Sequence, residues 1–307
     1  MAEAIADAGI DTRCGFIALI GAPNAGKSTL LNAFVGSKLS IVSHKVQTTR
    51  MSLRGITAEG NSQLIFIDTP GIFAPQRRLD RAMVSNAWSG AHDADLTGLL
   101  IDARKGLDEE AHAILQRLSQ MVGPKFLLLN KIDLVEKETL LALASAANQK
   151  ATFVATFMIS ALNGSGVADV KSWLAARVPP GPWHYPPDQM SDAPLRLLAA
   201  EITREKLYLR LHQELPYQSA VETTGWKELH DGSIRIEQTI FVERESQRKI
   251  VLGKGGQTIK AIGADARRDI TGIVEAPVHL FLFVKVRQNW GDDPERYREI
   301  GLEFPKE

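Results

Sequence analysis

Residues 21–28 read Gly-Ala-Pro-Asn-Ala-Gly-Lys-Ser, and this spacing constrains the fold more than any other feature of the chain. The apolar run FIALIG precedes it at 16–21, and the helix-like run STLLNAFVG follows at 28–36. The order predicts a buried strand, a glycine-rich turn and a helix. In such a turn the backbone N–H groups point inward and the helix N-terminus adds positive potential, so the segment predicts a phosphate-binding loop.

The loop predicts specific roles for its last residues. Lys27 is expected to reach the β- and γ-phosphates of a nucleotide, and Ser28 to ligate Mg²⁺. A chance glycine turn is the alternative, and the strand and helix on either side disfavour it. The residues expected to line the phosphates are Gly21, Ala22, Pro23, Asn24, Ala25, Gly26, Lys27, Ser28 and Thr29.

Further apolar runs at 62–69, 96–103, 125–131 and 152–160 alternate with helical patterns near 78–92, 108–121 and 136–148. Strands separated by helices imply crossovers, so the first half of the chain is predicted to be an α/β fold with a mostly parallel sheet. Ligands bind such sheets at the carboxyl ends of the strands.

Three short motifs follow those strands and resemble the translation-factor-like GTPases: Asp68-Thr69-Pro70-Gly71, Asn130-Lys131-Ile132-Asp133 and Ser160-Ala161-Leu162. The resemblance implies that Asp68 lies near Mg²⁺ and that the Gly71 amide meets the γ-phosphate. It also implies that the Asp133 carboxylate accepts hydrogen bonds from guanine, and that the 160–162 backbone contacts guanine O6. Adenine lacks the matching donor pair, so it would leave the carboxylate unpaired.

Thr48 and Thr49 lie between the glycine-rich loop and the Asp68–Gly71 motif, in Val46-Gln47-Thr48-Thr49-Arg50. GTPases use one switch threonine on Mg²⁺ when the γ-phosphate is present. Resemblance to related GTPases with this pattern favours Thr49, with Thr48 as the alternative. The expected catalytic groups are Lys27, Thr49, Asp68 and Gly71, and the expected metal ligands are Ser28, Thr49 and Asp68.

Two residues bear on the rate of hydrolysis. Ile72 follows the Asp68–Gly71 motif, where Ras-like proteins carry a glutamine that orients the attacking water, and its side chain can form no hydrogen bond. We therefore expect slow intrinsic hydrolysis. Asn24 matches an asparagine that helps bind K⁺ in related GTPases, and an asparagine that only stabilises the turn is the alternative.

A proline-rich segment divides the chain. VPPGPWHYPPDQ at 178–189 holds five prolines and predicts a linker, in agreement with a length of 307 residues that favours two domains. We expect a long helix at 194–215, a hairpin around His-Asp-Gly, a turn and helix at 253–272 and a strand at 278–286. This αββαβ order predicts a compact α+β unit.

The segment Ile250–Gly263 resembles the signature of a KH domain of type II, with residues 253–256 as its GxxG loop after an apolar strand. Small residues let the backbone approach phosphates, and the loop has basic neighbours. The resemblance implies RNA binding, and a KH-like module used for protein contact is the alternative. The expected RNA-binding residues are Gly253, Lys254, Gly255, Gly256, Ile259 and Lys260.

Together these motifs, in this order, resemble the bacterial Era GTPases over about residues 14 to 290. The resemblance implies binding of GTP, GDP and Mg²⁺, contact with small-subunit ribosomal RNA near its 3′ end, and a role in small ribosomal subunit maturation. In some members it also implies peripheral association with the inner membrane. Ala22 departs from the family, which often carries arginine there.

The expected divisions are a tail at 1–13, a nucleotide-binding G domain at 14–178, a linker at 179–193, a KH domain at 194–290 and a terminal segment at 291–307. Equal numbers of basic and acidic residues, 36 of each, give no guide to partners. One cysteine and no long apolar run favour a cytoplasmic protein, and we expect a monomer. A GTPase whose C-terminal domain docks a protein or a membrane is the alternative function.

Overall fold

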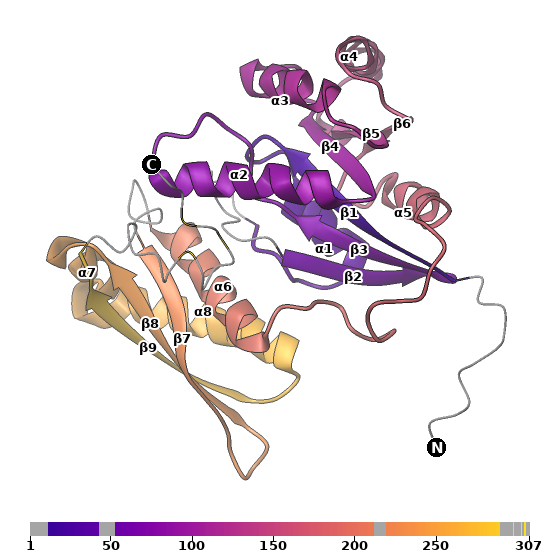
Figure 1. Cartoon of the computed structure of the whole chain (residues 1–307). Coiled ribbons are helices and arrows are strands. Elements are labelled where there is room, and N and C mark those ends of the chain that lie inside the picture. The colour runs from indigo at the N-terminus through magenta and orange to yellow at the C-terminus, as the bar shows by residue number, and fades with distance from the viewer. Residues whose placement is uncertain are drawn as a thin grey trace, which may run out of the picture. The chain divides into compact units, whose positions relative to one another are not determined.

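A computed structural model describes residues 12–42, 53–211 and 219–288, together with 297, 302 and 304. The chain divides into two compact units (Figure 1). Among the described residues, unit 1 contains 12–39, 53–75 and 83–192, and unit 2 contains 40–42, 76–82 and the described residues from 193 onward. Thr48 and Thr49 lie outside the described residues.

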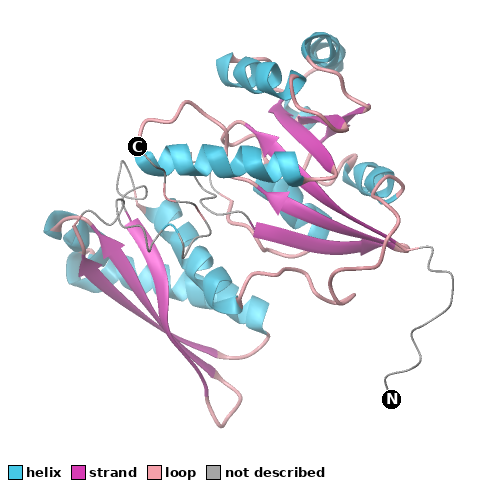
Figure 2. Ribbon diagram, in the orientation of Figure 1, coloured by secondary structure: helices cyan, strands magenta, loops and turns pink. Residues whose placement is uncertain are grey.

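Unit 1 contains a six-stranded sheet in the order β2-β3-β1-β4-β5-β6 (Figure 2). Strand β2 pairs antiparallel with β3, and every other neighbouring pair is parallel. The strands are β1 (Arg13–Gly21), β2 (Leu53–Glu59), β3 (Ser62–Asp68), β4 (Leu96–Asp102), β5 (Lys125–Asn130) and β6 (Ala155–Ile159). The predicted mostly parallel α/β fold is confirmed, and β2 is a strand that the sequence pattern did not identify.

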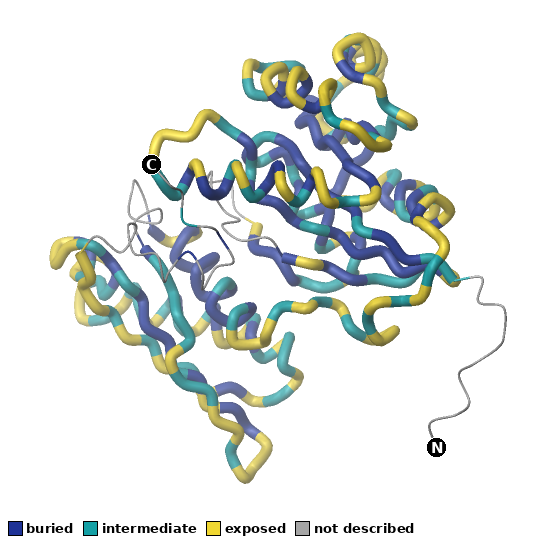
Figure 3. The backbone as a smooth tube through the Cα atoms, in the orientation of Figure 1, coloured by how far each residue is buried: buried dark blue, intermediate teal, exposed yellow. Residues whose placement is uncertain are grey.

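Helices cover both faces of this sheet. One face packs on α1 (Lys27–Val35) and α5 (Val167–Ala175). The other packs on α2 (Arg78–Asp93), α3 (Glu109–Ser119) and α4 (Lys137–Lys150), with a short 3-10 turn, η1 (Ile132–Leu134), before α4. Strand β4 is buried at all seven positions, as expected for a central strand covered on both sides. The buried cores run through the middle of each unit (Figure 3).

The proline-rich segment is held against unit 1 as far as residue 192, and we call residues 179–192 the strap. Gln63 on β3 is 1% exposed, and its side-chain oxygen accepts hydrogen bonds from the backbone N–H groups of His184 and Tyr185 at 2.9 and 3.1 Å. Its amide nitrogen donates to the Tyr185 carbonyl at 2.8 Å. The Ile56 N–H on β2 donates to the Met190 carbonyl at 2.8 Å. The predicted linker is therefore a fixed part of unit 1 over most of its length.

Unit 2 contains a three-stranded sheet, β7-β8-β9, in which β7 and β8 are antiparallel and β8 and β9 parallel. Its elements are α6 (Leu195–Arg210), β7 (Ser219–Glu228), β8 (Ile234–Val242), α7 (Glu245–Leu252), η3 (Lys254–Gly256), α8 (Gln257–Val274) and β9 (Val278–Val286). The three α-helices pack on one face of the sheet, where they form its core.

The apolar strand predicted before the GxxG loop is wrong, because residues 245–252 form helix α7. The buried positions are Gln247 and Val251, four apart, while Ile250 is 56% exposed. A buried pair at this spacing follows helical periodicity, since a strand would alternate every second residue. The observed order is thus αββααβ. Among the described helices, none is long and apolar enough to span a membrane.

Candidate functional site

The glycine-rich loop joins β1 to α1 through a backbone that requires two of its glycines. A Cβ on Gly21 would lie 2.5 Å from the Leu100 carbonyl oxygen, and one on Gly26 would lie 2.1 Å from the Asn130 side-chain nitrogen. Both residues have positive φ angles, 154° and 105°, and Asn24 between them has φ 62°. Asparagine tolerates this left-handed conformation better than most residues. The loop is therefore tightly wound at the N-terminus of α1.

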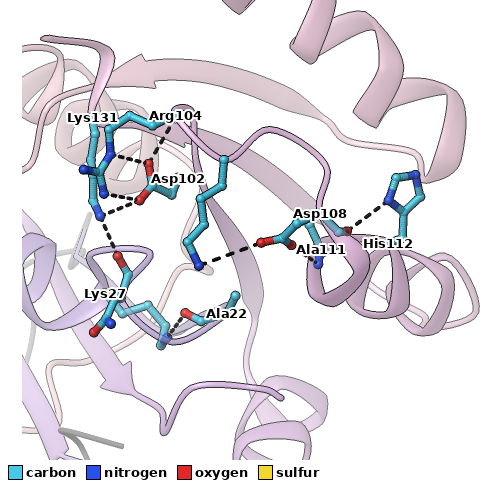
Figure 4. A network of polar contacts seen from close by, with 10 residues as sticks. Ala22, Lys27, Asp102, Arg104, Asp108, Ala111, His112 and Lys131 are labelled. Carbon is cyan, nitrogen blue, oxygen red and sulfur yellow. Dashed lines mark hydrogen bonds and ion pairs between the residues drawn. The ribbon is translucent and has the colours of Figure 1, made fainter. Parts of the chain in front are cut away.

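Lys27 is buried, with 6% exposure, and its ammonium donates to the Gly21 and Ala22 carbonyls, each at 3.0 Å (Figure 4). Burial lowers the pKa of Lys27 to about 8 from an ordinary 10.5. The negative charges of Asp68 and Glu110 act in the opposite direction and only partly offset it. The loop thus holds a desolvated cation at its base, where an anion would be strongly favoured.

The end of β3 meets the same loop. The Ser28 hydroxyl donates to Asp68 at 2.9 Å, which brings together the two described residues expected to bind Mg²⁺. A Cβ on Gly71 would lie 2.9 Å from the Cα of Pro23, so the backbone after β3 passes directly against the loop. Hydroxyl and carboxylate oxygens are ligands that Mg²⁺ accepts, and it keeps further positions for phosphate and water. The residues present therefore fit the ion.

Asn130, at the end of β5, joins two further parts of the site. It is 2% exposed; its side-chain nitrogen donates to the Ala25 carbonyl at 2.8 Å, and its oxygen accepts from the Ala161 N–H at 2.9 Å. Ala161 is buried and follows β6. The side chain of Asn130 is thus occupied by protein contacts, which gives it a bracing role between the loop and residues 160–162.

Lys131 also connects the segment after β5 to the glycine-rich loop and to the end of β4. Its ammonium donates to the Asn24 carbonyl and to the Asp102 carboxylate, both at 2.6 Å, and Arg104 donates to the same carboxylate (Figure 4). Burial alone would raise the pKa of Asp102, but the hydrogen bonds from Arg104 and Lys131 outweigh it and hold the pKa below its usual range. The sequence motifs did not include Asp102, whose only signal was its place at the end of a strand, as with Asp68 and Asn130.

The remaining predicted residues lie at the same edge of the sheet. Asp133 is exposed on η1, directly after the Lys131 contact, and Leu162 is 85% exposed. The Ser160 hydroxyl oxygen is buried with no hydrogen-bond partner among the described residues. Thr69 is buried, and its hydroxyl donates to the Leu19 carbonyl at 2.7 Å, so it ties β3 to β1.

Ile72 is placed differently from a water-orienting residue. Its side chain is 7% exposed and belongs to the core beneath α2, and its backbone N–H donates to the Gly21 carbonyl at 3.0 Å. An apolar side chain turned into the core cannot hold a water molecule.

The comparisons with known proteins agree with this geometry. Residues 16–131 match a family model described as 50S ribosome-binding GTPase, and residues 214–291 match a KH domain model. The chain is 70% identical over 306 residues to the GTPase Era of Bradyrhizobium sp. strain BTAi1, covering 100% of this chain and 99% of that protein. It is 72% identical to the GTPase Era of Afipia carboxidovorans, with 96% of each chain covered.

The chain belongs to the Era family of GTPases. As an Era GTPase it binds guanine nucleotides and hydrolyses GTP. A crystal structure of Era in complex with MgGDPNP and nucleotides 1506–1542 of 16S ribosomal RNA superposes with a TM-score of 0.89 at 36% identity, covering 94% of this chain and 99% of that one. A point variant of Aquifex aeolicus Era bound to GDP.AlF4⁻ superposes equally well, with the same identity and coverage.

The GxxG loop of this Era GTPase, residues 253–256, lies in unit 2 at the turn between α7 and α8. Gly253, Gly255 and Gly256 have φ angles of 71°, 59° and 76°. A Cβ on Gly253 would collide with Thr258, whereas one on Gly255 or Gly256 would meet no atom within 4 Å. Lys254 is exposed between them. The outer side of the loop is therefore open to another backbone.

In helix α8, which follows this loop, the predicted RNA-binding residues differ in their exposure. Ile262 is fully buried and Ile259 partly buried against the same core, while Lys260 is exposed. The turn thus presents an open backbone with the cations Lys254 and Lys260 beside it, and the isoleucines anchor the helix.

The pKa of Lys27 predicts a pH dependence of folding in nucleotide-free, Mg²⁺-free protein. The unfolded chain keeps this proton up to about pH 10.5, and the folded chain loses it near 8. The unfolded state therefore binds more protons in that window, so stability rises with pH. Relative to Lys27→Met, the wild-type free energy of unfolding should gain about 1 kcal/mol between pH 7 and 9 in urea titrations. Parallel profiles for the two proteins would contradict the burial argument.

Proposed function

We propose that this Era GTPase is a nucleotide-dependent switch that binds small-subunit ribosomal RNA near its 3′ end and assists maturation of the small ribosomal subunit. The observation that carries the proposal is the presence of a nucleotide site and an open GxxG loop on one chain, 94% of which superposes on the relative crystallised with MgGDPNP and 16S ribosomal RNA. We propose further that it acts as a cytoplasmic monomer.

In the nucleotide site, the amides of residues 21–29 would cradle the phosphates, and Lys27 would exchange its carbonyl contacts for the β- and γ-phosphates. Ser28 and Asp68 would hold Mg²⁺, with Thr49 as the third protein ligand. The Gly71 amide, next to Pro23, would meet the γ-phosphate. Mg²⁺ supplies positive charge that neutralises the charge developing on the phosphates. Because Ile72 lies in the core, the attacking water would be oriented by other groups and intrinsic turnover would be slow.

In the base site, Asp133 would accept two hydrogen bonds from the guanine N1–H and exocyclic amine. Lys131 and Asn130 would position this segment through their contacts with Asn24 and Ala25. The amides near Ala161, held by Asn130, would meet guanine O6.

Coupling between nucleotide state and RNA binding is supported by two short chain segments that belong to unit 2. It includes residues 40–42, just before the expected switch threonines, and the Val42 N–H donates to Glu205 on α6 at 3.0 Å. Residues 76–82, which follow the Asp68–Gly71 motif, belong to it as well. We propose that γ-phosphate binding changes both segments and thereby the RNA affinity of the GxxG loop.

Base specificity can be tested by the exchange Asp133→Asn. An asparagine amide can donate to the O2 of xanthine, whereas the carboxylate only accepts. GTP affinity should fall about 10- to 100-fold and XTP affinity should rise, as measured by titration calorimetry. Asp169→Asn, on the exposed face of α5, is the matched control and should bind GTP normally. Unchanged GTP affinity in Asp133→Asn would remove Asp133 from the site.

The proposed K⁺ dependence concerns Asn24, which lies within the glycine-rich loop and has a left-handed backbone. If its side chain helps to hold K⁺, the added positive charge should speed hydrolysis as an arginine finger does. GTP turnover should be faster in KCl than in NaCl at equal ionic strength, and the difference should disappear in Asn24→Ala. Equal rates in the two salts would leave Asn24 as a turn residue only.

RNA binding can be tested with Gly255→Asp. Aspartate tolerates the left-handed backbone at this position, and its charge would project into open space and repel phosphates. Affinity for an RNA of the 1506–1542 sequence should fall at least about tenfold, while GTP hydrolysis without RNA is unchanged. Gly232→Asp, at an open hairpin turn with φ 78°, is the matched control.

For the wild type, RNA affinity should differ between a GTP analogue and GDP. Identical affinities would refute the coupling. RNA affinity unchanged by Gly255→Asp would instead favour protein docking at this loop.

A further inference from the structure

The sheet of unit 2 has one face that no described element covers. Helices α6, α7 and α8 all contribute to the cores on one side, together with Leu280, Leu282 and Val284 of β9. Figure 2 shows the helices on that side and the opposite face of the sheet without a helix. Alternate residues of β9 therefore point away from the core, namely His279, Phe281, Phe283 and Lys285.

Phe281 and Phe283 are exceptional in this chain. They are 43% and 48% exposed, and every other phenylalanine, tyrosine or tryptophan within the described ranges is buried or half-buried. A protein that shields its other described aromatic rings leaves these two on one strand, two residues apart. Apolar groups that are exposed side by side are a feature of binding surfaces.

The charges around the two rings favour an anionic occupant. Strand β9 carries His279 and Lys285 on the open face and contains no acidic residue. On β8, Arg235 lies directly opposite His279, and its guanidinium stands over the Phe281 ring at 4.6 Å.

Strands β7 and β8 together carry two cations, Arg235 and Lys227, and two carboxylates on this face. Lys227 on β7 is opposite Arg235 and exposed. The acidic residues of this face are Glu222 and Glu237, and Glu237 is in an ion pair with Arg235 at 2.7 Å. Cations thus outnumber carboxylates around the rings.

Aromatic rings interleaved with cations are the means by which proteins bind single-stranded nucleic acid, since bases stack on the rings and phosphates meet the cations. We infer that the open face of β7, β8 and β9 is a second RNA-binding surface, in which bases stack on Phe281 and Phe283 and phosphates contact Lys285 and Lys227. The inference rests on the proposed RNA-binding function and adds a surface to it.

Two observations support RNA over another occupant. The RNA crystallised with the solved relative spans positions 1506 to 1542, which is 37 nucleotides, whereas a GxxG loop clamps about four. Most nucleotides of such an RNA therefore lie outside the GxxG loop, where a further protein surface can contact them. Strand β9 is also the edge strand of this sheet and packs against α7 and α8, the two helices that flank the GxxG loop, so an RNA strand leaving the loop would reach the open face around the β9 edge.

The test compares long and short RNA. Wild type, Phe281→Ala, Phe283→Ala and the double variant are titrated with the 37-nucleotide RNA and with overlapping hexanucleotides from it. Each single change should weaken the long RNA about tenfold, because a base loses its stacking partner, and should leave the best hexanucleotide unaffected. Lys285→Ala should weaken the long RNA and lower its salt dependence.

Matched controls separate the possible results. Val122→Ala, at a 96% exposed apolar position in unit 1, should change nothing, and Gly255→Asp should weaken both RNAs. Unchanged melting temperatures would exclude misfolding, since both rings lie outside the cores.

Normal binding of the long RNA by the double variant would overturn the inference. So would self-association of the wild type, seen by light scattering and lost in the double variant without any change in RNA affinity. If the wild type binds neither RNA, the proposed function itself fails.

Discussion

The buried side-chain amide of Asn130 holds together three loops of the nucleotide site: its own loop after β5, the glycine-rich loop and the segment after β6. The side chain of Asn130 donates to the glycine-rich loop at Ala25 and accepts from the segment after β6 at Ala161. Both bonds lie within the protein interior, where an unmade hydrogen bond is costly. The amide therefore fixes the distance between the glycine-rich loop, proposed to hold the phosphates, and residues 160–162, proposed to meet the base. It also explains why Gly26 can carry no side chain, because the Asn130 nitrogen occupies that space.

Much of this site was predictable because its elements are local in sequence. Glycine spacing, apolar strands and the motifs at their ends specified residues 21–28, 68–71, 130–133 and 160–162, and the parallel sheet then brought them to one edge. The same locality marked the GxxG loop. Patterns of this kind need only the chain's own periodicity and turn chemistry.

The parts that were missed depend on contacts between distant residues. In the sequence, Asp102 is one of several polar residues at strand ends, and its role shows only in the hydrogen bonds that it accepts from Lys131 and Arg104. The prolines of the strap are typical of a linker, and its attachment becomes visible only through contacts with residues more than a hundred positions earlier, such as Gln63 and Ile56. Helix α7 was mistaken for a strand because residues 250–252 form a short apolar run, and such runs fit either structure until burial distinguishes them.

The strap has a consequence for the edge of the large sheet. Strand β2 is the outermost strand, and one side of it would otherwise offer unpaired amides to another polypeptide. Residues 190 and 191 pair with it at Ile56 and Gly55, so the strap serves as a cap against edge-to-edge aggregation. A nucleotide-binding fragment cut at residue 178 would lose this cap and uncover the apolar patch of Phe16 and Ile65 beneath Trp183 and Tyr185. The natural end of a soluble fragment is therefore residue 192.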